Sequence, residues 1–442
     1  MNQYIIWFVI YILILIIIGI VSSRKATEDD FMIASRKVKG VQVAATMSAG
    51  FFDGAILSIY LAYIYQYGLS AIWAFVGLAL GFLFLRRYAS RIKKQADEMK
   101  VYSMPEYFYK ILGKKNGLIF SFFLILQFFL LLTVNLIVSG KVLSSIFLIS
   151  YPIAVIIGGL TILTYLLLAG FKAVVKTDFF QLIVMFLMTI GVAVLLFNKT
   201  LEVPYADFNL MSMGIGNIIG FVILGGLGIM VAPDLWQRIF ATKDEKNLKN
   251  GLSYSAIVLL VLGFLISVIG LVTKQMFPNI LPEDALVTGF ANLLPAGLTA
   301  LGMVLLYGVT LSSSDTATFV VSSILTRDLK NYTKRYNEES MKKLTRIFMI
   351  SFVFLAVLLG IVYQNIIALG FSFTSLNLAL FPVVFGTLYW KLKHRAVFWS
   401  LILSFLSIAI LFVGNYLNPQ TAVICLPVSA VSLVIFQKIF KE

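Results

Sequence analysis

The sequence is poor in the residues on which most enzyme sites depend. Its 442 residues include one cysteine, Cys425, one histidine, His394, and only 20 Asp and Glu. A single cysteine cannot form an intramolecular disulfide, and His394 lies in a basic loop, where a solvated histidine is more common than a metal ligand. The sequence also contains no GxxxxGK[ST] phosphate loop, no cluster of metal ligands and no Ser/His/Asp set. We therefore expect neither an enzyme nor an ATP-driven pump.

Charged residues are also scarce. They make up 12% of the chain, against roughly 25% in soluble proteins, and 60% of the residues are hydrophobic. A membrane-spanning helix needs about 20 apolar residues, and the mean hydropathy of +0.97 reflects many such runs. We expect an all-α polytopic protein of the cell membrane with about 13 transmembrane helices, at about 4–22, 41–66, 70–90, 117–140, 149–170, 177–197, 213–240, 252–273, 295–325, 345–363, 365–389, 396–414 and 420–437.

The basic residues indicate how the chain crosses the bilayer. With the N-terminus outside, only Lys141, Lys199 and Lys274 of the 35 Lys and Arg fall on the outer side, which leaves 32 (35 minus 3) inside. This distribution follows the positive-inside rule and places the C-terminus inside. The net charge of +15 is thereby explained without a nucleic-acid partner.

The order of the spans allows two inverted repeats. Five runs in 41–197 and five in 213–389 would then be related by inversion, because an odd number of spans reverses the second unit. Residues 1–40 then add a helix and an inner loop, and residues 390–442 add two helices. These terminal helices can pack on the core or on a second copy of the chain.

The first run of each repeat is interrupted. The interruptions are Ser48-Ala49-Gly50-Phe51-Phe52-Asp53-Gly54 in one and Gly225-Gly226-Leu227-Gly228 followed by Pro233-Asp234 in the other. Glycine in a membrane helix also serves close packing. Interruptions at matching places in two repeats, however, are the best sequence indication of a midplane binding site in a transporter.

A polar stretch, Leu311 to Thr318, lies near the middle of the apolar run 295–325. An Asp at the bilayer centre costs roughly 2.5–3.5 kcal/mol on insertion scales. On a helix, Ser312, Asp315 and Thr316 share one face, and converging oxygen ligands suit a small hard cation. From these residues alone, a hydroxyl-rich packing seam is equally compatible.

Two further carboxylates have alternative interpretations. Asp53 follows the first interruption, where unpaired backbone carbonyls beside a carboxylate can coordinate sodium. Asp53 can equally cap the second half of that helix, and the two roles are compatible. Asp178, at the inner end of a span, is explained by its position alone as a helix cap.

Several short strings occur in a characteristic order between residues 26 and 390. They are Glu28 to Arg36, Ser48-Ala49-Gly50 with Asp53, Ser103-Met104-Pro105-Glu106-Tyr107, Gly170 to Val174 with Thr177-Asp178 and Gln181, Gly226-Leu227-Gly228 to Asp244, and Ser312-Ser313 to Asp328. Together they resemble the sodium/solute symporter family, which includes carriers of proline, sugars, sialic acid, pantothenate and choline. The resemblance implies a LeuT-type 5+5 inverted repeat and solute uptake driven by sodium.

The resemblance also implies a sodium site. The hydroxyls of Ser312 and Ser313 and the carbonyl of Val309 would contribute from the run 295–325. The carbonyls of the first broken helix would be those of Ala49 and Phe52 in one alignment, or of Phe51 and Gly54 in the other, with Asp53 close by.

Some members of the family bind a further sodium beside the Asp of the string T-D-x-x-Q. In this sequence the corresponding residues are Asp178, Ser312, Asp315 and Thr316. Asp315 replaces a hydroxyl there, and it would strengthen the site or accept a proton.

The solute would bind at the broken helices. A Trp of the proline carriers is replaced by Gly225, and the polar residues of the sugar carriers are replaced by Ala55 and Ile56, which argues against proline and sugars as solutes. The residues expected near the solute are Phe51, Ala55, Ile56, Asn135, Gly225, Gly228, Phe371 and Ser372.

We therefore expect sodium-coupled symport of a small polar organic solute by alternating access. One alternative is a proton-coupled carrier that uses Asp53, Asp178 or Asp315. Another is a receptor or channel on the same scaffold that binds the solute without accumulating it.

Overall fold

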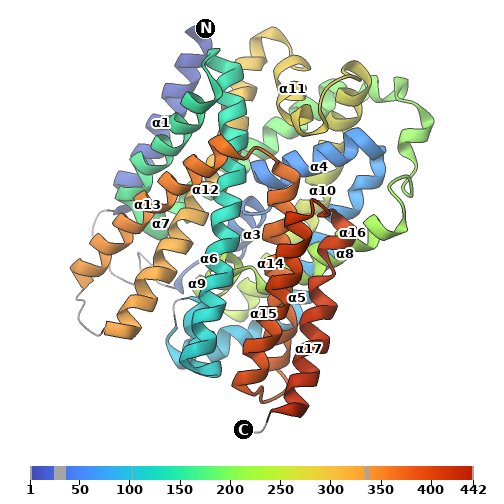
Figure 1. Ribbon diagram of the computed structural model, residues 1–442. Helices are drawn as coiled ribbons and strands as arrows, with labels where there is room; N and C mark the ends of the chain where they lie inside the picture. Colours follow the sequence, from blue (N-terminus) through green and yellow to red (C-terminus); the bar gives the residue numbers. More distant parts are fainter. Residues whose placement is uncertain (1, 24–35, 102, 334–337, 441–442) are drawn as a thin grey trace.

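Helices account for most of the described chain, which comprises residues 2–23, 36–101, 103–333 and 338–440 of a computed structural model. In lipid, a helix satisfies its backbone N–H and C=O groups internally. The only strand-like pairing among these residues is a single bridge between Val38 and Thr242. The helices in chain order are α1 (Asn2–Ser23), α3 (Gly40–Ala49), α4 (Gly54–Tyr67), α5 (Trp73–Met99), α6 (Met104–Phe147), α7 (Tyr151–Leu196), α8 (Ile215–Gly228), α9 (Pro233–Ala241), α10 (Glu245–Met276), α11 (Ala285–Asn292), α12 (Ala296–Thr333), α13 (Glu338–Val362), α14 (Ile366–Thr387), α15 (His394–Val413), α16 (Pro419–Ala422) and α17 (Cys425–Ile439) (Figure 1).

The expected apolar runs are helical over most of their length. Among the described residues, eight helices are long and apolar enough to cross a membrane, and the bent pair α8–α9 makes a ninth. The expected break between the spans 149–170 and 177–197 is absent from the backbone, because α7 continues across both runs. The stretch between them, residues 171–176, contains neither Gly nor Pro to stop a helix. The side chains of residues 168–176 lie outside the described set.

Both expected helix interruptions are present. The first separates α3 from α4 at residues 50–53. The second follows α8 as a single 3-10 turn, Ile229–Val231, after which α9 departs at 47°. The glycines Gly225 to Gly228 themselves remain helical, so the break lies after them. Pro233 begins α9, where the missing N–H of proline has no helical partner to lose.

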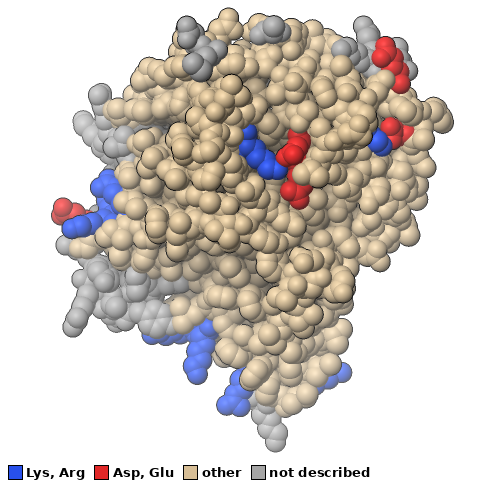
Figure 2. Space-filling view, turned by 45° about the horizontal axis from the view of Figure 1, so that its top comes forward, with Lys and Arg blue, Asp and Glu red and all other residues tan. Residues whose placement is uncertain are grey.

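The N-terminus and the C-terminus lie at opposite ends of the molecule (Figure 1). α15 and α17 stand side by side at the C-terminal end, and α11 lies near the opposite end. A short 3-10 turn, Pro282–Asp284, leads directly into this helix. In Figure 2, Lys and Arg lie mainly along the lower and left margins, and the broad tan surface between them carries few charges.

The peripheral helix α1 is anchored to the core by Tyr11. Its hydroxyl accepts a hydrogen bond from Gln181 Nε2 of α7 at 2.6 Å. A Cβ added at Gly308 of α12 would lie 2.5 Å from the same oxygen. Gly308 therefore makes room for the tyrosine, and α1, α7 and α12 meet one residue before Val309.

The two broken helices are joined through α3 and α9. Val38 N donates to Ala241 O at 3.1 Å, and Lys243 N donates to Val38 O at 2.9 Å. Arg238 of α9 donates to Thr46 Oγ1 of α3 at 2.8 Å and pairs with Asp234 at 3.0 Å. The Arg238 side chain is only 1% exposed, so its bond to Thr46 holds α3 and α9 together inside the core, and Asp234 of the same helix balances its charge.

Replacing Arg238 by Met should destabilise the protein strongly. The substitution leaves the Asp234 carboxylate buried without its compensating charge, which costs roughly 3–5 kcal/mol. The double variant Asp234→Asn/Arg238→Met should lose less, because no uncompensated charge remains. Thermal unfolding of both variants in detergent checks this order, and equal melting temperatures would contradict it.

Candidate functional site

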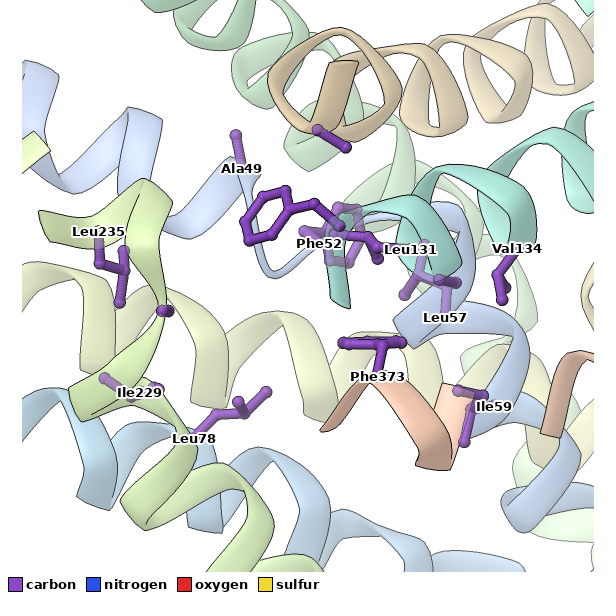
Figure 3. Packing of buried hydrophobic residues seen from close by; sticks show 14 of the residues in the cluster. Ala49, Phe52, Leu57, Ile59, Leu78, Leu131, Val134, Ile229, Leu235 and Phe373 are labelled. Carbon is purple, nitrogen blue, oxygen red and sulfur yellow. The ribbon is translucent and has the colours of Figure 1, made fainter. Parts of the chain in front are cut away.

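The break between α3 and α4 is maintained by two side chains that capture backbone amides. Ile56 N donates to Asp53 Oδ1 at 2.7 Å, and Ala55 N donates to Asn135 Oδ1 of α6 at 3.3 Å. In a continuous helix these amides would bond the carbonyls of Phe52 and Phe51. Those two carbonyls consequently have no backbone donor among the described residues. Figure 3 shows the non-helical connection at Phe52 between α3 and α4.

Asp53 therefore caps α4, as one of the two interpretations of the sequence proposed. The residue is fully buried, and its second oxygen, Oδ2, has no hydrogen-bond partner within the described chain. An ionised carboxylate is costly to bury unless it is paired. Its free oxygen is thus available to a cation. The carbonyl of Ala49, in contrast, accepts from Phe52 N at 3.2 Å.

The hydroxyls of α12 fall into two groups. On one side of the helix each hydroxyl bonds a carbonyl three or four residues earlier, which satisfies it locally; these residues are Thr310, Ser314, Thr318, Ser322 and Thr326. The face of Val309, Ser312, Ser313 and Thr316 differs. The hydroxyls of Ser313 and Thr316 are buried without a partner in the described structure. The packing-seam and ion-site interpretations therefore apply to different faces of one helix.

The break in the first core helix and α12 are in contact. A Cβ added at Gly54 would lie 2.5 Å from Thr310 Cγ2, so only glycine permits the start of α4 to approach α12 so closely. Phe52 and Val309 line one small cavity, and the Asp53 carboxylate lies near the Ser313 hydroxyl without a hydrogen bond between them. Oxygen ligands from both helices are thereby brought together, which is the chemistry that a small hard cation requires.

The residues expected at a further sodium site are only partly described. Asp315 is fully buried on α12, and Thr316 is 5% exposed. Asp178 lies on α7, but its side chain is outside the described set. Gln181, one turn further along α7, reaches Gly308 O at 3.4 Å, so this part of α7 does approach α12.

A second cavity, of about 110 Å³, lies between α4, α5, α8 and α14. Its lining is largely apolar and aromatic. Among the expected solute residues, Phe51, Ile56, Gly225, Gly228 and Phe371 line it. Residues that the sequence analysis did not assign to the solute also contribute, and the most informative of these are Tyr60, Phe221, Phe373, Thr374 and Asn377. The only sequence signal for them is an aromatic or polar side chain inside an apolar run.

Three expected solute residues do not line this cavity. Asn135 bonds Ala55 N and its own helix at Leu131 O. Ser372 returns its hydroxyl to Ala368 O at 2.7 Å. Ala55 is fully buried beside Asn135. Their polar groups make hydrogen bonds within and between helices and do not line the cavity.

The presence of glycine at position 225 has a structural explanation that the sequence did not reveal. A Cβ there would lie 2.7 Å from Leu78 N and 2.9 Å from Gly77 C, both in the backbone of α5. The glycine thus permits close packing of α5 on α8, and its presence is more than the loss of the Trp found in the proline carriers. Phe221, one turn earlier, contributes the aromatic ring instead, 6.0 Å from the ring of Phe371.

Substituting Gly225 by Ala should push α5 and α8 apart. Overpacking of this kind costs about 1–3 kcal/mol. Gly226 is a matched control on the same helix, since its Cβ would meet nothing closer than Gly77 O at 3.7 Å. Melting temperatures should fall for Gly225→Ala and stay nearly constant for Gly226→Ala. A similar fall in both variants would argue against this packing role.

Comparisons with known proteins agree with this geometry. The model of the "Sodium:solute symporter family" matches residues 31–404. The chain is 27% identical to the osmoregulated proline transporter of Bacillus subtilis, over 86% of this chain and 83% of that protein. It is 28% identical to a sodium/proline symporter of Staphylococcus aureus, over 57% of this chain and 53% of that protein.

Solved structures show the same fold. A Na⁺-coupled sialic acid symporter, in a substrate-bound outward-open state, matches with a TM-score of 0.83 at 16% identity, over 100% of this chain and 98% of that one. A transporter of the nucleobase-cation-symport-1 family matches with a TM-score of 0.57 at 12% identity, over 93% and 94% of the two chains. These neighbours have the LeuT fold. The chain therefore belongs to the sodium:solute symporter family, as a multi-pass membrane transporter that couples solute movement to sodium.

Proposed function

We propose that this chain imports a small polar organic solute together with sodium across the cell membrane by alternating access. The solute would occupy the cavity between α4, α5, α8 and α14. Sodium would bind where the α3–α4 break meets α12. Two repeats, 41–197 and 213–389, would be related by inversion within about 13 spans, with the N-terminus outside and the C-terminus inside.

A single observation carries the proposal. Phe51 and Phe52 are adjacent in the non-helical connection, yet Phe51 lines the larger cavity and Phe52 lines the small cavity that it shares with Val309. An ion that orders this connection therefore also orders the wall of the solute cavity. Such a shared element is what coupling between two ligands requires.

The proposed sodium ligands come from the α3–α4 break and from the facing residues of α12. The structure favours the carbonyl of Phe52 over that of Ala49, because an amide already bonds Ala49 O. Val309 O, Ser312 Oγ and Ser313 Oγ would complete the site from α12. Asp53 would contribute the negative charge that offsets the cation. Asp178, Asp315 and Thr316 remain the proposed ligands of a further sodium.

Sodium would act by stabilising one conformation. A ligand shifts a conformational equilibrium only by its differential affinity for the two states. An ion bound to both α4 and α12 favours the state in which the two helices are in contact. Movement of one positive charge across the membrane also supplies about 2.3 kcal/mol per 100 mV, which drives solute accumulation.

The relatives carry proline, and the packing role of Gly225 removes the sequence argument against it. Proline is therefore the first solute to test in uptake assays. Accumulation against a gradient would distinguish transport from the alternative of a receptor or channel.

Ser313→Ala should raise the sodium concentration for half-maximal uptake at least about tenfold, because a hydrogen-bond-like contact to a charged group contributes about 1.5–3 kcal/mol. Ser314→Ala is the matched control, since its hydroxyl bonds Thr310 O on the other face at 2.6 Å. That variant should stay within about twofold of the parent.

Sodium-stimulated uptake in proteoliposomes checks both variants. Unchanged sodium dependence in Ser313→Ala and in the double variant Ser312→Ala/Ser313→Ala would refute the site. Uptake that is independent of sodium and driven by a pH gradient would instead establish the proton-coupled carrier.

A further inference from the structure

An apolar groove lies between α1, α7 and α12, outside the proposed solute cavity. Its volume is about 460 Å³, against about 110 Å³ for the solute cavity. The three helices pack against one another, and α1 lies at the edge of the molecule (Figure 1). Ligand pockets typically measure about 300–1,000 Å³, so the groove is large enough to hold a ligand.

The groove opens onto the lipid-facing surface of the protein. Trp7, Leu187 and Leu298 belong to its lining, and all three side chains are exposed. Leu298 also lies in a helix segment, residues 297–326, that is long and apolar enough to cross the membrane. Large exposed apolar patches mark contact with a membrane or another partner. The groove is therefore continuous with the surface on which lipid chains lie.

Water and a second copy of the chain are poor occupants. In the described lining only Trp7 and Tyr11 carry polar atoms, and the Tyr11 hydroxyl already accepts from Gln181. A trapped water needs about two to four polar partners. A helix about 10–12 Å across with a pitch of about 5.4 Å fills roughly 500 Å³ in one turn, which exceeds the whole groove.

The size of the groove suits a hydrocarbon chain. A cavity of roughly 150 Å³ holds the six carbons of benzene in another protein. By the same ratio, the volume of about 460 Å³ holds roughly 18 carbons, the size of one acyl chain.

Gly191 provides an independent sign of free space. It lines the groove, and a Cβ added there would meet no atom within 4 Å. It lies inside the helix α7 and has no positive φ, so neither close packing nor backbone conformation requires a glycine at this position. The space beside it is available to a ligand from outside the chain.

A single side chain, Leu305, separates the groove from the proposed sodium site. Leu305 lines the groove and also lines the small cavity that contains Phe52 and Val309. A ligand packed in the groove therefore supports one wall of that cavity.

We propose that the groove binds one acyl chain of a membrane phospholipid, and that the bound chain stabilises the arrangement of α12 that binds sodium. Both ligands favour the same contact between the α3–α4 break and α12, so each strengthens the binding of the other. The acyl-chain site is independent of the proposed function, whereas its coupling to sodium rests on the sodium site proposed above.

Photolabelling of the purified full chain tests the site. The probe is a phosphatidylethanolamine with a diazirine in the middle of one palmitoyl chain, titrated in glyco-diosgenin micelles, and the labelled residues are mapped by mass spectrometry. We expect saturable labelling at 187–195 and 294–305, competed by unlabelled phosphatidylethanolamine. Labelling spread evenly over α13 and α15 would overturn the proposal. Competition by free palmitic acid alone, or a dimer that covers the groove and excludes the probe, would also overturn it.

Gly191→Leu should block the groove, and leucine is a better helix former than glycine. Each CH₂ that is excluded weakens binding about fourfold, so the loss of two or more lowers probe affinity at least about tenfold. Gly297→Leu is the matched control, because a Cβ there also meets no atom within 4 Å and Gly297 lies outside the lining. It should label like the parent. Equal labelling of Gly191→Leu and the parent would overturn the site.

Labelling in sodium chloride and in potassium chloride tests the coupling. Sodium should raise the affinity for the probe at least about fivefold, the lower end of typical coupling between two ligands. Leu305→Ala should lose most of this sodium effect. Leu301→Ala should keep it, because Leu301 lines the groove but not the small cavity. No sodium effect in the parent, or an undiminished effect in Leu305→Ala, would overturn the coupling.

The two proposals fail separately. Sodium-driven uptake in proteoliposomes, with no saturable labelling, would overturn the acyl-chain site and leave the symporter intact. Saturable labelling together with uptake that is independent of sodium would overturn the proposed function and leave the acyl-chain site intact.

Discussion

The capture of two backbone amides by side chains is the constraint on which the site depends. Asn135 binds the amide of Ala55, and Asp53 binds the amide of Ile56. A membrane helix normally keeps such amides for its own carbonyls, because nothing in lipid can replace them. Here Asn135 of α6 and Asp53, the cap of α4, accept hydrogen bonds from these two amides, so the helix stays broken while both amides remain bonded. The acceptors released by this exchange, Phe51 O and Phe52 O, are what a cation can use.

α12 fits against this break because its polar groups are divided between two faces. On one face, each hydroxyl donates to a backbone carbonyl of α12 itself. That face is therefore polar in composition, but its hydroxyls are already hydrogen-bonded. The other face keeps Ser313 and Thr316 without partners in the described structure. Hydroxyl content alone therefore says little about ion binding. What matters is which hydroxyls have no carbonyl within hydrogen-bond distance, and this depends on the side-chain rotamers.

The sequence was informative where the signal was local. Glycines, a proline and a carboxylate inside apolar runs predicted both broken helices and the polar stretch of α12. It was less informative about residues whose contacts lie on a helix distant in the sequence. Asn135 was recognised as polar, but its contact with α4 depends on how α6 packs, and Gly225 was interpreted as a missing wall because its contact with α5 is tertiary. The bond from Asn377 Nδ2 to Gly228 O likewise depends on how α14 packs against α8.

Coupling follows from the shortness of the connection at residues 50–53. In the proposed site, an ion bound to Phe52 O would restrict ψ of Phe52 and φ of Asp53. Because Phe51 is the next residue in the same short connection, its backbone would lose part of its freedom as well. The linkage would be reciprocal, since a solute packed on Phe51 would stabilise the same connection and strengthen ion binding by the same factor. A longer or glycine-rich connection would couple the two ligands weakly, so the two adjacent phenylalanines belong to the proposed mechanism together with the oxygen ligands.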